Sequence, residues 1–297
     1  RGLQQVIQLA RKVAVTDVPV LLTGETGTGK EVFAQAIHNG SARAKQPFVA
    51  INCSAFSKEL LESEIFGHKA GAFTGALKDK KRLFEEANHG TIFLDEIGEM
   101  AYGLQAKLLR VLETGEYIKV GDMKPTKIDV RIVSATNRNL KEEIANSNFR
   151  EDLYFRLSVF HLHLPPLRER REDIPELAAA FLKFFAAKMG KQVKGFAADC
   201  QAWMQSYAWP GNVRELRNVI ERALIICDDY ITLDDMPLDF RSSTLSGSAA
   251  DGDDFELAEA EHRHIQRVLQ YTKGNKAEAA RLLKIGLTTL YRKIEEY

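Results

Sequence analysis

Residues 18–31 read VPVLLTGETGTGKE, a short apolar run that leads into a glycine-rich loop and a lysine. From Gly24 to Lys30 the spacing is G-x-x-x-x-G-K, and the loop lies between a predicted strand and a predicted helix, as a phosphate-binding loop requires. Glycines let successive backbone N–H groups point at phosphate oxygens, and the positive end of the following helix adds to the attraction. We therefore predict a nucleotide-binding loop made of Gly24, Glu25, Thr26, Gly27, Thr28, Gly29, Lys30 and Glu31, in which the lysine reaches the β- and γ-phosphates.

Glu31 departs from the commonest form of this loop, in which a Ser or Thr follows the lysine and ligates Mg²⁺. A carboxylate at this position either holds magnesium through a water molecule or stands idle at the start of the helix. The residues of the loop do not decide between these two interpretations.

Short apolar runs alternate with helical patterns on both sides of the loop. The expected strands are residues 18–23, 47–52, 91–95, 130–135 and 159–164, and the expected helices between them are residues 31–38, 104–113 and 140–145. Runs that are apolar on both faces indicate a parallel sheet covered by helices. The alternation predicts an α/β nucleotide-binding subdomain over residues 1–166.

The pattern changes after Pro165 and Pro166, where the chain turns predominantly helical. Helical spacing over residues 172–189, 197–207 and 213–226 predicts an all-helical subdomain over residues 167–240. Residues 241–254 read RSSTLSGSAADGDD and are expected to be a flexible linker. A last helical block covers residues 255–297.

The composition excludes several classes of protein. Forty-one basic and forty-one acidic residues give a net charge of +0, so the chain as a whole is no polycation, and any nucleic-acid site must be a local patch. Three cysteines, Cys53, Cys200 and Cys227, without CxxC spacing argue against a disulfide scaffold and against a cysteine zinc site. They fit a reducing, cytoplasmic location, and no apolar run is long enough to span a membrane.

Polar residues end three of the predicted strands, where open α/β sheets bind their ligands. Asp95 and Glu96 follow the apolar run TIFL, and such a pair can supply one acid to hold magnesium and one base to orient the attacking water. Thr136 and Asn137 end the run at residues 130–135 and can sense the γ-phosphate. Asn52 ends the run at residues 47–52 in the same way. Each of these places can also be an ordinary polar strand end.

Three arginines are candidates for contacts with phosphate. Arg150 and Arg156 lie in FREDLYFRL and are either solvated surface residues or arginine fingers donated to a neighbouring subunit's nucleotide. Arg214, in GNVREL, opens a helix of the helical subdomain. It either contacts the nucleotide or forms an ion pair with a nearby acid at the start of the helix.

An unusual loop lies between charged neighbours, and its members are Gly71, Ala72, Phe73, Thr74, Gly75 and Ala76. Two glycines bracket an aromatic residue and a threonine, which suggests a mobile contact surface. The alternative is a hairpin tip whose phenylalanine turns inward.

The last 37 residues read as helix, turn and helix at residues 276–283, 284–286 and 287–296. Eight basic and four acidic residues make this a local basic patch in a neutral chain. The side chains predicted to reach DNA bases or phosphates are Lys276, Thr288, Thr289, Tyr291, Arg292 and Lys293. The alternative is a helical hairpin used only for oligomerisation.

Several stretches together resemble one family. GETGTGKE, GAFTGA, FLDEIGEM, SATNRNL, FREDLYFRL, LPPLRERREDI and WPGNVREL are similar to the bacterial sigma-54-dependent transcription activators, which are AAA+ ATPases also called enhancer-binding proteins. The resemblance runs nearly continuously from residue 1 to about residue 240. The end of the chain, GNKAEAARLLKIGLTTLYRKIEEY, resembles the Fis-type DNA-binding domain, and departs from it at Lys284, Gly286 and Leu287.

The resemblance implies an AAA+ domain with a helical lid, in ring oligomers, usually hexamers, that hold ATP at their subunit interfaces. The sequence itself leaves a dimer, a hexamer and a heptamer open. It assigns Mg²⁺ binding to Asp95 and water activation to Glu96, and a glutamate after the lysine is normal in the family. It also assigns a switch role to Asn52, the sensor I position to Thr136 and Asn137, the two trans-acting arginines to Arg150 and Arg156, and sensor II to Arg214.

For partners, the resemblance implies upstream double-stranded DNA and sigma-54 RNA polymerase, which Phe73 and Thr74 of the GAFTGA loop would touch. ATP hydrolysis would then remodel the closed promoter complex into the open one. Relatives often carry a receiver domain of a two-component system, a ligand-sensing domain, or neither. Fis-type domains pair as dimers, and a stripe at Ile265, Val268 and Leu269 is expected to serve that pairing. Two rival hypotheses are a nucleotide-gated DNA-binding repressor without productive hydrolysis and a general AAA+ remodelling protein.

Overall fold

The structure of the protein is a computed structural model that describes residues 2–67, 83–237, 261, 264–266, 268–269, 272 and 275–296. The predicted contact loop at residues 71–76 and the predicted linker at residues 241–254 lie outside the described residues. The chain divides into two compact units, Arg1–Arg241 and Ser242–Tyr297, and each is described by itself.

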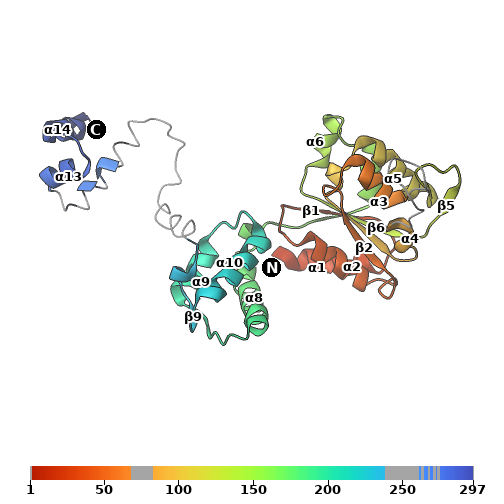
Figure 1. Ribbon diagram of the computed structural model, residues 1–297, viewed down its shortest axis with the longest axis horizontal. Helices are drawn as coiled ribbons and strands as arrows, with labels where there is room; N and C mark the ends of the chain where they lie inside the picture. Colours follow the sequence, from red (N-terminus) through yellow and green to blue (C-terminus); the bar gives the residue numbers. More distant parts are fainter. Residues whose placement is uncertain are drawn as a thin grey trace. The chain divides into compact units, whose positions relative to one another are not determined.

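A parallel sheet forms the centre of the first unit (Figure 1). Its strands are β1 (Val20–Thr23), β2 (Phe48–Asn52), β3 (Thr91–Asp95), β6 (Arg131–Thr136) and β7 (Phe160–His163). They follow the order β2-β3-β6-β1-β7, and every neighbouring pair is parallel. The predicted α/β class is therefore confirmed, and the strand bounds differ from the expected ones by at most two residues.

Helices cover both faces of the sheet, because its strands carry apolar side chains on both faces. One face packs on α1 (Gly2–Ala14) and α2 (Lys30–Asn39), and the other on α5 (Tyr102–Thr114), α6 (Leu140–Ala145) and α7 (Glu151–Leu157). Successive residues of β1 show the alternation, because Val20 and Leu22 belong to the α1–α2 core and Leu21 belongs to the opposite core.

Further elements of this subdomain lie around β2, β3 and α5. Helices α3 (Lys58–Phe66) and α4 (Leu83–Glu86) pack near β2, a short 3₁₀ turn covers Ile97–Glu99, and β4 (Glu116–Ile118) pairs antiparallel with β5 (Pro125–Lys127). The sequence did not predict α1, whose end is held by the buried Arg131. This guanidinium donates hydrogen bonds to Val13 O and Ala14 O, each 2.8 Å long.

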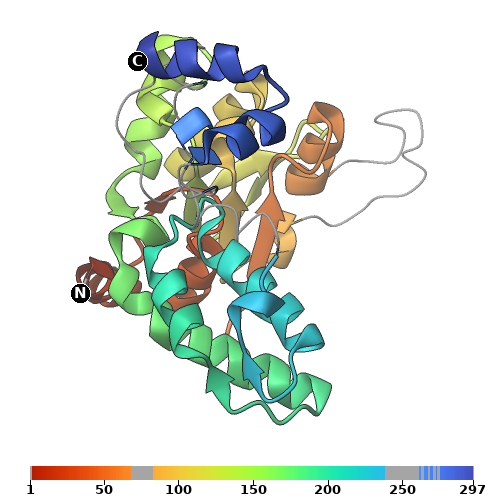
Figure 2. The same cartoon turned by 90° about the vertical axis from the view of Figure 1, so that its left-hand side faces the viewer.

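The predicted helical lid follows β7 and is confirmed. Short 3₁₀ turns at Leu167–Glu169 and Arg171–Asp173 lead into α8 (Ile174–Met189), α9 (Ala198–Ser206) and α10 (Asn212–Ile226), which pack side by side (Figures 1 and 2). Strands β8 (Gly195–Phe196) and β9 (Tyr230–Ile231) form a short parallel pair, and a last 3₁₀ turn covers Leu233–Asp235. Helix α8 begins two residues later than expected, because the second of the first two turns takes up residues 171–173.

Trp209 is fully buried at the centre of the lid. Its indole Nε1 donates to Met204 O at 2.7 Å, and its ring lies edge-on to the rings of Trp203 and Tyr207. The tryptophan thus fixes the turn that precedes α10, and with it the direction in which this helix starts.

The second unit has the predicted helix–turn–helix, made of α13 (Lys276–Leu282) and α14 (Leu287–Glu296). Its core joins Ile265, Ala279, Ala280 and Leu290, with Val268 and Leu269 packed against them. Ile265 is thus buried within the unit, Val268 and Leu269 are half-buried against the same core, and the pairing of two copies through this stripe stays a prediction. None of the described helices is both long and apolar enough to cross a membrane.

Candidate active site

The glycine-rich loop joins the carboxyl end of β1 to the amino end of α2, as predicted. Gly27 and Gly29 have φ values of +81° and +102°, a region of backbone conformation that glycine adopts readily. Gly29 caps α2, so the positive end of this helix faces the loop. Space at Gly29 is open, since an added Cβ atom would meet nothing within 4 Å. The loop therefore has the open, amide-rich character that an anionic group needs.

Lys30 lies inside the loop rather than in solvent. Its Nζ donates hydrogen bonds to Gly24 O at 2.9 Å and to Glu25 O at 3.2 Å. Burial lowers the pKa of this ammonium, and the carboxylates of Glu96 and Asp95 oppose that shift. A phosphate placed in the loop would compete with the two carbonyl oxygens for the lysine's protons, because an ionised acceptor makes the stronger hydrogen bond.

Asp95 and Glu96 stand at the carboxyl end of β3, beside the loop. Asp95 Oδ1 accepts a hydrogen bond from the backbone N–H of Glu96, which has a φ of +50°. Glu96 Oε2 in turn accepts one from Asn137 N at 3.3 Å, and Asn137 Nδ2 donates to Thr26 Oγ1 at 3.0 Å. The predicted acid pair, the predicted sensor residue and the loop are thus joined in one network.

Two predicted site residues have other contacts. Asn52 pairs in register with Asp95, but its side-chain oxygen accepts from Ser54 N at 2.8 Å and from Ser54 Oγ at 2.7 Å. Thr136 is buried, and its hydroxyl oxygen accepts from Arg138 N at 3.1 Å. In this structure the side chains of Asn52 and Thr136 each stabilise the local turn that follows their own strand.

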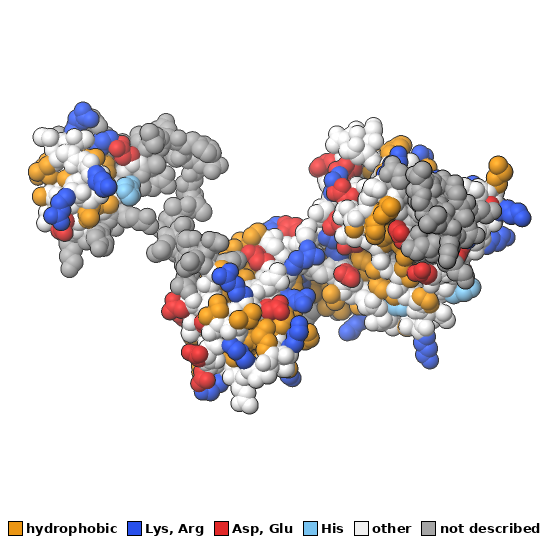
Figure 3. All heavy atoms as spheres, in the orientation of Figure 1, with side chains coloured by type: hydrophobic (Ala, Val, Ile, Leu, Met, Phe, Trp, Pro, Cys, Tyr) orange, Lys and Arg blue, Asp and Glu red, His pale blue; other side chains and the backbone are white. Residues whose placement is uncertain are grey.

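The lid closes the site from the other side. Thr26, Gly27, Gly29, Lys30, Glu31, Val32, Asp95, Glu96, Phe181, Val213, Arg214 and Arg217 line one cavity of about 250 Å³. Val213 N and Arg214 N lie 3.0 and 3.3 Å from Gly27 O, so the first turn of α10 rests on the loop. Figure 3 shows Lys and Arg side chains along the edge of the lid that meets the sheet subdomain.

Arg150 and Arg156 do not line this cavity. Arg150 precedes α7, binds Asp152 through two hydrogen bonds of 3.0 and 2.6 Å, and lies over the ring of Tyr102. The guanidinium of Arg156 reaches Leu112 O at 3.4 Å. Both arginines therefore belong to the α5–α7 side of the subdomain.

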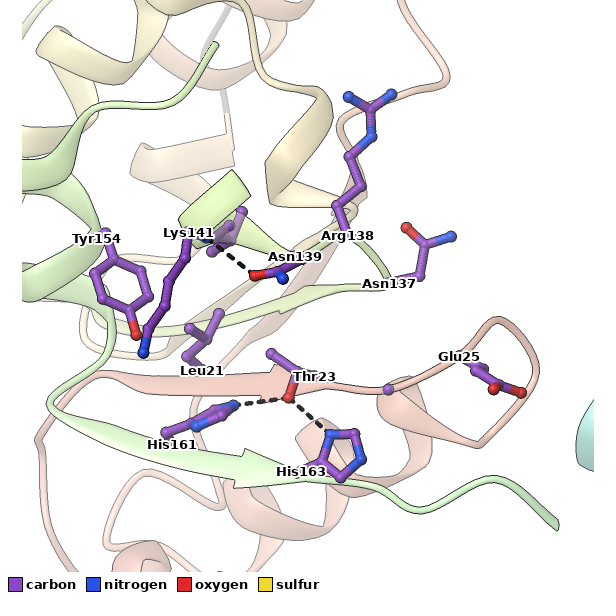
Figure 4. Close-up of a pocket in the computed structure, with 12 residues that line it drawn as sticks. Leu21, Thr23, Glu25, Asn137, Arg138, Asn139, Lys141, Tyr154, His161 and His163 are labelled. Atoms are coloured by element: carbon purple, nitrogen blue, oxygen red, sulfur yellow. Dashed lines mark hydrogen bonds between the residues drawn. The ribbon is translucent and has the colours of Figure 1, made fainter. Parts of the chain in front are cut away.

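A second cavity, of about 330 Å³, opens beside the loop over β1 and β7 (Figure 4). Here the hydroxyl of Thr23 lies within hydrogen-bonding distance of His161 Nε2 at 2.7 Å and of His163 Nδ1 at 3.2 Å. Burial lowers the pKa of His161. Within the described parts of the chain, no three His, Cys, Asp or Glu side chains are grouped to hold a metal ion.

The side chains predicted to touch DNA lie on α13 and α14. Thr288, Tyr291 and Arg292 are exposed, whereas Lys276 and Thr289 are half-buried. The ammonium of Lys276 lies 4.6 Å from the centre of the Tyr291 ring, and Lys293 forms an ion pair with Glu261. Hydrophobic and basic side chains share the visible surface of this unit (Figure 3).

Comparison with known proteins agrees with this arrangement. Residues 1–163 match the sigma-54 interaction domain, residues 168–252 the AAA+ ATPase lid domain, and residues 256–297 the Fis family of bacterial regulatory proteins. The chain belongs to the sigma-54 activator family of AAA+ ATPases. The chain is 46% identical over 285 residues to the transcriptional regulatory protein ZraR of Klebsiella oxytoca, and the match covers 95% of the chain and 64% of ZraR.

The chain is also 47% identical over 293 residues to the alginate biosynthesis regulator AlgB of Pseudomonas aeruginosa, and this match covers 98% of the chain and 65% of AlgB. It thus spans less than two thirds of the length of either relative. Among solved structures, NtrX from Brucella abortus in complex with ATP is 34% identical with a TM-score of 0.73, over 99% of this chain and 67% of NtrX.

The structure adds site residues that the sequence did not single out. Arg217 lines the cavity one helical turn after Arg214, and the i, i+3 spacing on α10 could have indicated it. Asn212 and Arg168 contact the loop through Glu25, 187 and 143 residues away in the chain. No pattern of neighbouring residues in the sequence predicts such a long-range contact.

Proposed function

We propose that this protein hydrolyses ATP to ADP and phosphate, and that it uses this energy to remodel the sigma-54 RNA polymerase closed complex into the open complex from an upstream DNA site. The observation that carries the proposal is the convergence of Lys30, Asp95, Glu96 and Arg214 on one cavity beside the glycine-rich loop. Two of these residues come from the sheet edge, one from the loop and one from the lid, so the site needs the whole AAA+ fold.

In the proposed site each of this chain's residues has one task. The loop amides and Lys30 bind the phosphates. Asp95 would hold Mg²⁺, and a carboxylate completed by phosphate oxygens and water is the oxygen donor set that this ion prefers. Glu96 accepts a proton from the attacking water, and Asn137 N holds the Glu96 carboxylate in place through its 3.3 Å hydrogen bond. Arg214 neutralises phosphate charge from the lid.

We further propose that a neighbouring copy of the chain completes the site in a ring of up to six or seven subunits. Arg150 and Arg156 lie on the α5–α7 side and away from their own cavity, which suits donation to a neighbour's γ-phosphate. Such trans-acting arginines speed phosphoryl transfer by about 10³–10⁵. In a protomer without a neighbour, the ion pair with Asp152 would hold the Arg150 guanidinium in one orientation.

The remaining assignments extend the same proposal. Residues 71–76 would touch sigma-54 through Phe73 and Thr74, and exposed groups of α14 would bind upstream DNA in the bacterial cytoplasm. Asn52 would report nucleotide state to Glu96 by leaving its contacts with Ser54. We propose the subdomain bounds 1–166, 167–240, 241–254 and 255–297, and a place for this protein in a two-component system.

Two assays on the purified chain test the proposal. Steady-state ATP turnover should be abolished in Glu96→Ala, while ATP binding persists, because the base is lost and the loop is intact. Open-complex formation on a sigma-54 promoter should fail in Thr74→Ala at normal ATP turnover. Wild-type protein that binds DNA and ATP without turnover would instead favour a nucleotide-gated repressor, and normal promoter opening by Thr74→Ala would remove the proposed role of the loop.

A further inference from the structure

Asn212 joins the lid to the glycine-rich loop through both ends of its side-chain amide. The residue is fully buried, and its φ of +54° is a left-handed conformation that asparagine tolerates better than most residues. Its Oδ1 accepts a hydrogen bond from Leu167 N at 2.7 Å, and its Nδ2 donates toward Glu25 Oε2 and Thr26 O, each at 3.1 Å. One side chain thus connects the start of α10, the segment that enters the lid, and the loop.

Glu25 belongs to the loop, but its carboxylate accepts hydrogen bonds from residues of the lid. Arg168 donates to both carboxylate oxygens, at 2.9 and 2.6 Å, and Asn212 supplies a third donor. These hydrogen bonds lower the pKa of Glu25 to about 2, and the bond from Arg168 has the largest effect. The pair therefore stays ionised at neutral pH. The side chains of Arg168 and Glu25 are 42% and 41% exposed, so water screens the pair, and its strength depends on the bidentate geometry and the buried amide.

The backbone of the loop and the lid are also in direct contact. Gly27 O accepts hydrogen bonds from the first turn of α10, and an added Cβ atom on Gly27 would lie 2.3 Å from Gly211 O. The start of α10 therefore cannot move relative to the loop without breaking several contacts together. Arg214 lies on this same first turn, so its place over the cavity follows from them.

We infer that Asn212 and Arg168 are positioning residues: with Glu25 they form a latch that holds the lid on the phosphate loop and sets where Arg214 stands. The inference rests on the proposed ATP site and deepens it. Arg168 has a second effect, because it neutralises the negative charge of Glu25, a residue of the loop whose charge would otherwise repel a phosphate bound to the same loop.

The electrostatic part is tested by a double-mutant cycle on the full chain, with ATP affinity and KM against kcat as readouts. Arg168→Gln removes the positive charge that balances Glu25 and should weaken ATP binding about fivefold, the value of one screened ion pair. Adding Glu25→Gln should restore most of that loss, because the unbalanced charge is gone. Arg171→Gln, which removes an exposed arginine of the same segment, is the matched control and should bind as the wild type does. Equal losses in the single and double variants would overturn the electrostatic argument.

The mechanical part is tested without nucleotide, by amide hydrogen exchange of the full chain. Asn212→Gly keeps the left-handed backbone easy to form and removes the side-chain hydrogen bonds. Exchange at Leu167, Val213 and Arg214 should speed up at least about tenfold, while α5 keeps its protection. Unchanged exchange at these three amides would refute the latch. This readout separates the two proposals, since a chain that never binds ATP would defeat the proposed function and leave the exchange result standing.

Discussion

Replacing Gly27 with alanine tests whether the lid rests directly on the loop. The new methyl carbon would lie 2.3 Å from Gly211 O and 3.1 Å from Arg214 Cβ, so the lid or the loop must shift. Overpacking of this kind costs about 1–3 kcal/mol. The φ of +81° adds about 1–2 kcal/mol for a residue with a side chain. Gly29→Ala is the matched control, because its φ of +102° brings a backbone penalty too, but its methyl group meets nothing within 4 Å.

The assay is thermal unfolding of the full chain without nucleotide, so that no phosphate meets either new methyl group. For a unit of this size each kcal/mol shifts the Tm by about 2–4 °C. The 1–3 kcal/mol of overpacking should therefore lower the Tm of Gly27→Ala by about 2–12 °C more than that of Gly29→Ala. Equal melting temperatures would refute the close contact between loop and lid.

Three further predictions concern the rest of the fold. Burial lowers the pKa of His38, so the unfolded chain takes up its proton first, and stability should fall as pH drops below about 6.5, by up to about 1.4 kcal/mol per pH unit in urea titrations. His38→Asn should flatten this slope. Lys284 has a φ of +53°, so Lys284→Gly should stabilise α13–α14 by up to about 1 kcal/mol in hydrogen exchange, and a loss of protection would contradict this. Trp209→Phe leaves Met204 O unpaired in the lid and should cost about 2–4 kcal/mol of unfolding free energy, and a cost below the error of the titration would speak against its central place.

Elements with strong periodicity could be predicted from the sequence. The strand at residues 91–95 and the helix at residues 140–145 have the expected bounds, because the strand is an apolar run that ends at Asp95 and the helix has apolar residues at i and i+4, Leu140 and Ile144. The helix at Gly2–Ala14 also has apolar residues at helical spacing, at Val6, Ala10 and Val13, but the sequence did not predict it. Boundaries shifted elsewhere because 3₁₀ turns and caps take up residues that a periodic pattern assigns to the helix.

Contacts between distant segments could not be predicted in this way. The loop pattern placed Glu25 in the nucleotide site, but nothing local indicated that its carboxylate would face Arg168 and Asn212 across the lid. Periodicity at residues 265, 268 and 269 shows which side of the helix is apolar and not what covers it, and within the second unit Ile265 is buried while the other two residues pack against the same core. The contact of Asn52 with Ser54 is different, since an asparagine followed by serine two residues later commonly forms such a turn.

The most direct test of the account mixes two inactive variants and measures steady-state ATP turnover. Lys30→Ala cannot bind the phosphates, and Arg150→Ala cannot serve a neighbour, so each alone should be nearly inactive. In randomly mixed rings about one interface in four joins an intact loop to an intact arginine, so the mixture should regain about a quarter of wild-type turnover. If the mixture is as inactive as each variant alone while the wild-type protein is active, the claim that a neighbouring subunit completes the site is contradicted.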